Sequence, residues 1–339
     1  MTKNELSARL AVETAVDLHR VAEGFIVGMM VRLHQLEADI VAAIALRRDG
    51  RASFQLEAIL DDTNKLIAEA FTELANRVEQ ETDDLAEAVQ ERERRNWLLL
   101  FGFPVTAAIL LPTGAEMLVA GATARSWLWR QGGDFSFRVN ALIRNAFSAA
   151  GATGGAPDLG ELIRKLQGRT PDSPTPTIAQ TERAAQTTVK TTAETVGTKV
   201  REAVGLAGGE SAPGGTVIRY GWQQISVLDA RTTQICRAYA FKIWNASFEP
   251  VGHSLPYNGG PPRHPYCRSV VKLHLLDEDP LKDMNFAEWL RTLTEEQQAR
   301  IFGPGRMKLW REGKITDADL IDQQRRALTL DEFNTKTVK

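Results

Sequence analysis

The stretch LHRVAEGFIVGMMVRLHQLEADIVAAI, residues 18–44, carries apolar side chains at a regular helical spacing. The apolar positions are Leu18, Val21, Phe25, Met29, Leu33, Leu36, Ile40 and Ile44. Steps of three or four residues place these side chains along one face of an α-helix. We therefore predict one long helix over residues 4–48, ended by the glycine-containing sequence RRDGRAS at residues 47–53.

The residues that follow continue this pattern and predict a helical N-terminal region over residues 1–168. A second apolar stripe indicates another long helix over residues 54–95, with Ile59, Ile67, Phe71, Leu74, Val78, Leu85 and Val89 on one face. Two long helices joined by a short turn form an antiparallel hairpin. Further helices are expected over residues 138–149 and 158–168, and Asp158 has the residue type and position of an N-cap.

The apolar run NWLLLFGFPVTAAILLP occupies residues 96–112. Gly102 and Pro104 interrupt it, and it is shorter than the roughly 20 residues that a membrane-spanning helix needs. We expect a buried core helix here. The alternative is a membrane-active segment over residues 96–129, because the residues after the run are also fairly apolar.

A proline-rich linker at residues 169–176 separates the N-terminal region from a predicted α+β module at residues 177–276. The elements expected in the module are a helix over residues 178–209, strands over residues 216–226 and 269–276, and a short helix with Asp229 as its N-cap. Threonines lower the helix propensity of residues 178–209, so docking against other elements is expected to hold this helix.

Residues 277–339 predict a helical C-terminal extension. Its clearest helix starts with Thr294 as N-cap and Gln297 at the capping-box position, and Gly303 is placed to end it. Further helical sequence, TDADLIDQQ and LTLDEF, follows at residues 316–324 and 328–333. The predicted fold is therefore mainly α with a small α+β module.

Composition narrows the class of protein. The start of the chain shows no secretory signal, and two cysteines do not make a disulfide framework, so synthesis in the cytosol is expected. Residues 1–95 hold 12 basic and 19 acidic side chains, whereas residues 96–275 hold 18 and 11. The basic middle is suited to nucleic acid or to an acidic partner surface. The sequence contains no P-loop, nucleophile elbow or paired-histidine zinc helix, so no enzyme is predicted.

Both cysteines lie close in sequence to histidines in the predicted module. Cys236, His253, His264 and Cys267 form a possible ligand set for zinc, with Asp229 as another candidate for the shell. Three other interpretations stay open: a disulfide between the cysteines, a Cys–His nucleophilic pair, and a stiff proline-rich turn whose His264 and Cys267 only pack.

Four blocks of sequence carry a resemblance to a known family. They are TIAQTERA (residues 177–184), SVLDARTTQICRAY (226–239), PPRHPYCRS (261–269) and a tail from FAEWLRTL at residue 286 to LTLDEF at residue 333. In order and spacing, these blocks over residues 177–335 resemble the phage Mu protein F-like minor head proteins, also called phage head morphogenesis proteins. Ser269 stands where that family often has another cysteine, and RAYAFKIWN lacks the glycine that usually follows the first cysteine.

The family blocks suggest a two-part structural clasp. Its first side would consist of Asp229, Arg231, Thr232 and Cys236, and its second side of Pro262, His264, Pro265, Cys267 and Arg268. Paired Arg–carboxylate contacts suit such a clasp, for example between Arg268 and Asp229.

The resemblance implies a structural protein of the virion, made in the host bacterial cytoplasm and located in the head interior near the portal. Its expected partners are the portal protein, capsid or scaffold proteins, and double-stranded DNA bound without sequence specificity during packaging or ejection. The candidate phosphate contacts are Arg219, Arg237, Lys242, Arg263 and Lys272. Membrane-active DNA delivery and an effector enzyme are the alternatives. No cofactor is expected, and zinc at the cysteines is the alternative to that expectation.

Overall fold

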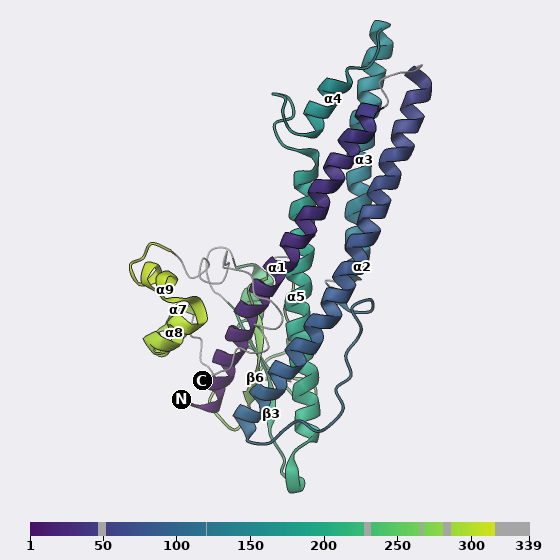
Figure 1. The fold of residues 1–339 in the computed structure, drawn as a ribbon. Coiled ribbons are helices and arrows are strands. Elements are labelled where there is room, and N and C mark those ends of the chain that lie inside the picture. The colour runs from purple at the N-terminus through teal and green to yellow at the C-terminus, as the bar shows by residue number, and fades with distance from the viewer. Residues whose placement is uncertain (47–51, 120, 227–231, 265–266, 281–285, 316–339) are drawn as a thin grey trace.

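The computed structural model describes residues 1–46, 52–119, 121–226, 232–264, 267–280 and 286–315. A long helical shaft dominates it, built from α1 (Lys3–Leu46), α2 (Ala52–Phe101), α3 (Ala124–Thr153) and α5 (Thr177–Glu210), as Figure 1 shows. These helices pack against one another along their lengths, and the short α4 (Leu159–Leu166) packs against α3 near one end of the shaft. The predicted hairpin of long helices is confirmed, as is the mainly α fold with a small sheet.

The apolar stripes of α1 and α2 form the centre of the shaft. Every member of the first stripe except Phe25 is buried, and Phe25 packs partly buried against the same core. Asp158 caps α4 as predicted, because its side chain accepts a hydrogen bond from the Glu161 N–H at 2.8 Å. Local sequence signals therefore fix both the long helices and this short one.

The predicted core helix over residues 96–112 is only partly correct. The helix α2 continues to Phe101 and then ends, since Gly102 adopts a positive φ of 79° that favours glycine. Trp97 and Leu100 are buried, whereas Leu98 and Leu99 are about half exposed and Leu110 is 89% exposed. Residues 104–112 contain no helix, strand or turn. Within the described residues, no helix combines the length and apolar character that crossing a membrane requires.

The third shaft helix is much longer than the predicted 138–149. A short hairpin of β1 (Leu118–Val119) and β2 (Ala122–Thr123) leads into α3, and Thr123 is its N-cap. One buried stripe of α3 consists of Leu128, Gly132, Phe135, Val139 and Ile143. The prediction missed the first half of this stripe because Gly132 does not look like a core residue, although it lies directly against the Phe71 ring.

The module contains an antiparallel sheet with strand order β5-β4-β3-β6. The strands are β3 (Tyr220–Ile225), β4 (Ile243–Asn245), β5 (Pro250–Val251) and β6 (Val270–Leu275). Trp222 at the centre of β3 pairs with Leu273 of β6 and with Trp244 of β4. Both predicted strands are present, but β3 starts four residues later than expected because the 3-10 turn η1 (Pro213–Gly215) and an extended segment precede it.

The helix α5 connects the module to the shaft. It packs against α1, α2, α3 and β6, as its threonine-rich sequence required. Small residues let its neighbours approach closely: a Cβ on Gly208 would lie 2.4 Å from the Trp97 ring, and one on Gly205 would lie 2.4 Å from the Trp222 ring. One hydrophobic core consequently runs from the shaft through α5 into the sheet.

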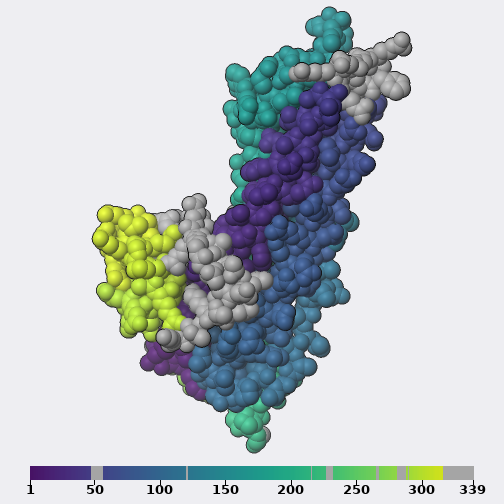
Figure 2. Space-filling view, in the orientation of Figure 1, coloured from purple at the N-terminus to yellow at the C-terminus, as the bar shows by residue number. Residues whose placement is uncertain are grey.

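The C-terminal helices form a lobe at the side of the shaft, which Figure 2 shows in yellow. The lobe consists of α7 (Phe286–Thr292), α8 (Glu295–Phe302) and α9 (Pro304–Arg311), and it buries apolar residues against the start of α1. Thr294 and Gln297 form the predicted capping box, and Gly303 follows the end of α8. The predictions for residues 316–324 and 328–333 lie outside the described residues.

Candidate functional site

The site begins with the short helix α6 (Gln234–Tyr239). Its N-cap is Thr233, whose hydroxyl accepts a 3.5 Å hydrogen bond from the Cys236 N–H. This corrects the prediction that Asp229 caps the helix. The cap fixes Cys236 in the first turn of α6, where its side chain is 3% exposed. Asp229 and Arg231 lie outside the described residues, so their predicted roles in the clasp stay predictions.

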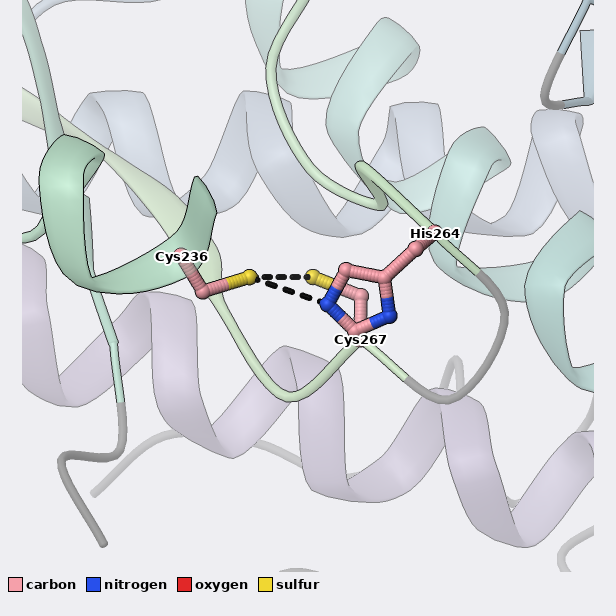
Figure 3. A group of neighbouring side chains, drawn as sticks. All are labelled: Cys236, His264 and Cys267. Carbon is pink, nitrogen blue, oxygen red and sulfur yellow. Dashed lines mark hydrogen bonds between the residues drawn. The ribbon is translucent and has the colours of Figure 1, made fainter. Parts of the chain in front are cut away.

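The second half of the site is the loop that leads into β6. The Cys267 N–H donates to the His264 carbonyl oxygen at 3.2 Å, which holds these two residues close together. Cys267 is 1% exposed and His264 is half-buried. Both side chains point toward α6, as Figure 3 shows. Pro265, predicted to stiffen a turn here, lies outside the described residues, whereas Pro262 is half-buried within the loop.

The three side chains meet at one point. Cys236 Sγ lies 3.1 Å from His264 Nε2 and 3.6 Å from Cys267 Sγ (Figure 3). The three potential ligand atoms all lie within 4.8 Å of one another. The Thr233 hydroxyl also approaches His264 Nε2, at 2.9 Å. We refer to Cys236, His264 and Cys267 as the Cys–His cluster.

Hydrogen bonding makes the two thiols of the cluster unequal. The hydrogen bond with Cys267 lowers the pKa of Cys236, and those with Ser269, Thr233 and His264 act in the same direction against the effect of burial. The same hydrogen bond and the burial of its sulfur raise the pKa of Cys267. The surroundings of the two sulfurs therefore favour the thiolate form at Cys236 more than at Cys267.

Polar side chains behind the cluster hold its backbone in place. Ser226 Oγ donates to the Cys236 carbonyl oxygen at 3.2 Å and lies 2.8 Å from Ser269 Oγ. Gln224 donates to Ser226 Oγ at 3.0 Å and accepts from Arg263 Nε at 2.8 Å. This chain of bonds links the end of β3, the first turn of α6 and the start of β6. Ser269 thus has a positioning role at the place where the resembled family often has a cysteine.

His253 is not part of the cluster, contrary to the predicted ligand set. Its Nε2–H donates to the Ile243 carbonyl oxygen at 2.8 Å, and its Nδ1 accepts from the Leu255 N–H at 3.2 Å. Both ring nitrogens are used by the backbone, which leaves neither for a metal ion. The ring also packs edge-on against Trp244, so His253 supports the sheet.

The candidate phosphate contacts divide by burial. Lys272 is 0% exposed, so the prediction that it contacts DNA is wrong. Its Nζ donates to Asn4 Oδ1 at 3.1 Å and to the Leu273 carbonyl oxygen at 3.2 Å. It is buried because α1 packs across β6, and Asn4 of α1 supplies one of its two hydrogen-bond partners.

The other four candidates remain at least partly at the surface. Arg263 lies 3.6 Å from the Tyr239 ring centroid, and burial lowers its pKa. Arg219 is exposed and forms an ion pair with Asp277 at 2.9 Å. Arg237 is exposed, its Nε donating to the Thr232 carbonyl oxygen, and Lys242 is half-buried. Arg268, assigned to the clasp, is half-buried beside the cluster.

Two kinds of chemistry are available to the Cys–His cluster with both cysteines reduced. Two thiol groups and one imidazole suit a soft metal ion such as zinc. The 3.1 Å contact between Cys236 and His264 is also within the range of a nucleophile and its base. The two sulfurs stand 3.6 Å apart, well beyond the roughly 2.05 Å of a disulfide bond, and both cysteines are free.

The sequence reasoning missed two contributors to this site. Thr233 was not predicted as the cap of α6. Threonine is a common N-cap residue, and Thr233 directly precedes the first residue of this helix. Arg263 was assigned to DNA, although an arginine among aromatic residues often stacks on a ring.

No family model, curated protein or solved structure matches this chain.

Proposed function

We propose that this chain is a phage minor head protein, a structural component of the head interior that acts in head morphogenesis. One observation carries the proposal. The two blocks that resemble the Mu protein F-like family, residues 226–239 and 261–269, meet at the Cys–His cluster, with Cys236 from the first block and His264 and Cys267 from the second. Motifs that are separate in sequence and adjacent in space form a more specific signature than either motif alone.

The surface of the shaft supports a role in protein assembly. Trp129 is 52% exposed and Phe137 is 75% exposed, and both project from α3. They are eight residues apart, which places them about 80° from each other around the helix and therefore on one half of its surface. Exposed aromatic side chains are frequent centres of protein–protein contacts. We infer that this face of α3 contacts a neighbouring head protein, with the portal protein as the first candidate.

The assembly role is tested in cells that produce the virion encoding this chain. We expect the chain to copurify with the portal protein and to be present in purified virions by mass spectrometry. The double variant Trp129→Ala, Phe137→Ala should reduce the recovered portal protein, whereas Val27→Ala, Val31→Ala on the exposed face of α1 should not. Absence of the chain from both virions and portal complexes would contradict the proposal.

Contact with DNA is the second part of the proposed role. Arg237 of α6 is exposed and the half-buried Lys242 follows shortly after this helix, and phosphate contacts of this kind are independent of sequence. Binding of a mixed-sequence duplex should weaken as salt rises, and Arg237→Ala should reduce the slope of log affinity against log salt by about 1. Replacement of buried Lys272 by methionine should leave that slope unchanged. Binding that is absent at about 50 mM salt would exclude this part.

Membrane-active DNA delivery is a second candidate function, favoured by the exposed side chains of Leu98, Leu99 and Leu110. Here residues 96–129 would bind a lipid surface without crossing it. The chain should then float with liposomes, and the double variant Leu99→Asp, Leu110→Asp should not. Failure of the wild-type chain to float removes this candidate and leaves the assembly role unaffected.

A further inference from the structure

We propose that Cys236, His264 and Cys267 bind one Zn²⁺ ion, which crosslinks α6 to the loop that leads into β6. The inference rests on the geometry of the Cys–His cluster and is independent of the proposed virion role. The ion would connect Cys236 to His264 and Cys267, which follow it in the chain by 28 and 31 residues.

Two distances from Cys236 Sγ can be compared with those of a tetrahedral zinc site. Zinc–sulfur bonds of about 2.3 Å separate two thiolate sulfurs by about 3.8 Å on the edge of a tetrahedron. The two sulfurs here are 3.6 Å apart. Cys236 Sγ and His264 Nε2, at 3.1 Å, would separate by a few tenths of an ångström to admit the ion. The change asked of this contact is small compared with the length of the side chains that carry the two atoms.

The elements around the cluster hold the donors in place before an ion arrives. The Thr233 cap fixes Cys236, and the backbone hydrogen bond between Cys267 and His264 holds the other two ligands together. Ser226 and Ser269 form a hydrogen-bonded link between the two segments behind the sulfurs. Thiolate sulfur and imidazole nitrogen together select zinc over hard ions such as Mg²⁺. A donor set held in this way reduces the ordering needed for binding.

The described residues supply three ligand atoms, and a tetrahedral ion needs a fourth. His264 is only half-buried, so a water molecule can reach the open position. The Thr233 hydroxyl, 2.9 Å from His264 Nε2, is placed to hydrogen-bond with such a water. The main consequence is mechanical, because the ion would join two segments of a module whose strands are short.

The first test is metal content. The full chain is produced in zinc-supplemented medium and freed of any affinity tag. Elemental mass spectrometry should then find about one Zn²⁺ per chain. Cys236→Ser, Cys267→Ser and His264→Asn should each lower the content to below about a tenth of an equivalent. The matched control is His253→Asn, a histidine of the same module outside the cluster, which should keep full zinc. A wild-type chain with less than about a tenth of an equivalent overturns the proposal.

A second measurement uses the wild-type chain only, so it does not depend on the folding of the variants. Cobalt(II) added to the metal-free chain should give the thiolate charge-transfer and tetrahedral ligand-field bands of a sulfur-ligated ion, and zinc should abolish them. Both thiols should resist iodoacetamide with zinc present and react after a chelator is added, while Mg²⁺ should give no protection. Equal alkylation with and without zinc, or closure to a disulfide in the presence of zinc, would show that the cluster is a dithiol without a metal.

Discussion

The two halves of α1 have opposite surroundings although they belong to one continuous helix. From Val21 onward the helix is buried along a single apolar stripe, and side chains such as Val27, Val31 and His34 are exposed. From Asn4 to Leu18 no residue is exposed. The buried residues of this first half include Asn4, Ser7, Arg9, Glu13, Thr14 and Asp17. We call the first half the junction and the second half the outer shaft.

The difference follows from the number of neighbours around the helix. Other helices pack against the outer shaft on one side only, so a single apolar stripe is enough to fill that contact and the opposite side can be polar. The junction is surrounded by α2 and α5, by β6 and by the C-terminal lobe. Polar side chains buried there need partners, and they find them across elements: Arg92 of α2 reaches Asp17, and Arg201 of α5 reaches Glu93 and the Val271 carbonyl oxygen.

The largest expected effect comes from breaking a buried ion pair of the junction. Arg92 Nη1 lies 2.9 Å from Asp17 Oδ2, and both side chains are almost fully buried. Asp17→Ala leaves the Arg92 charge without this partner and should lower the free energy of unfolding by about 3–5 kcal/mol. Urea denaturation measures this loss.

Replacing both partners gives the control for that prediction. The double variant Asp17→Leu, Arg92→Met should recover much of the lost stability, because the Arg92 charge is then no longer buried without Asp17. If the single variant costs less than about 1 kcal/mol, as an exposed pair would, the distinction between junction and outer shaft fails.

Two adjacent glycines of α3 provide a test within the shaft. A Cβ on Gly132 would lie 2.7 Å from Cγ of Phe71, whereas one on Gly133 would have no atom within 4 Å. Gly132→Ala should therefore destabilise the chain by about 1–3 kcal/mol, while Gly133→Ala should stabilise it by up to about 1 kcal/mol. Thermal melting of the two variants measures both signs. Equal effects would show that Phe71 does not pack on Gly132.

The outer shaft was predictable from sequence, and the junction was not. The periodic stripe of α1 and the caps at Asp158 and Thr294 depend on residues close in sequence, so local patterns revealed them. The burial of Lys272 depends on α1 crossing β6, which are far apart in the chain. The buried stripe of α3 includes Gly132, which packs against a phenylalanine that is distant in the chain. Such contacts carry no local periodic signal.

The candidate site divides in the same way. The spacing of His264 and Cys267 in a proline-rich turn correctly indicated that they point to one place, because a turn is a local structure. Cys236 was included because it belongs to the predicted helix next to this turn and to the second family-like block, residues 226–239. His253 was included by residue type, and its exclusion follows from two backbone partners that exist only in the folded sheet.

Lys272 should make the stability of the junction depend on pH. Burial lowers its pKa from an ordinary 10.5 to about 7, although the nearby Glu278 carboxylate acts in the opposite direction. Between these two values the unfolded chain binds more protons than the folded chain, so stability rises as pH increases.

The expected slope from Lys272 is up to about 1.4 kcal/mol per pH unit between pH 7 and 10. Lys272→Met should remove this slope, as measured by urea denaturation at a series of pH values. Burial also lowers the pKa of His274, to about 3. The titration of His274 changes stability only below about pH 6.5, so it does not affect the comparison of the two chains between pH 7 and 10. A slope that is the same in both chains would mean that Lys272 is hydrated.

The smallest expected effect comes from an ion pair of the outer shaft that joins the same two helices as Asp17 and Arg92. Arg32 Nε of α1 donates to Glu73 Oε2 of α2 at 2.7 Å, but the Glu73 side chain is 63% exposed. Water and salt screen such a pair, so Glu73→Gln should cost only about 0.2–1 kcal/mol and almost nothing in about 1 M salt. The loss from Asp17→Ala should persist at that salt concentration, because solvent ions cannot reach a pair that is almost fully buried. Denaturation of the two variants at low and high salt therefore separates the effect of burial from the effect of charge within one helix pair.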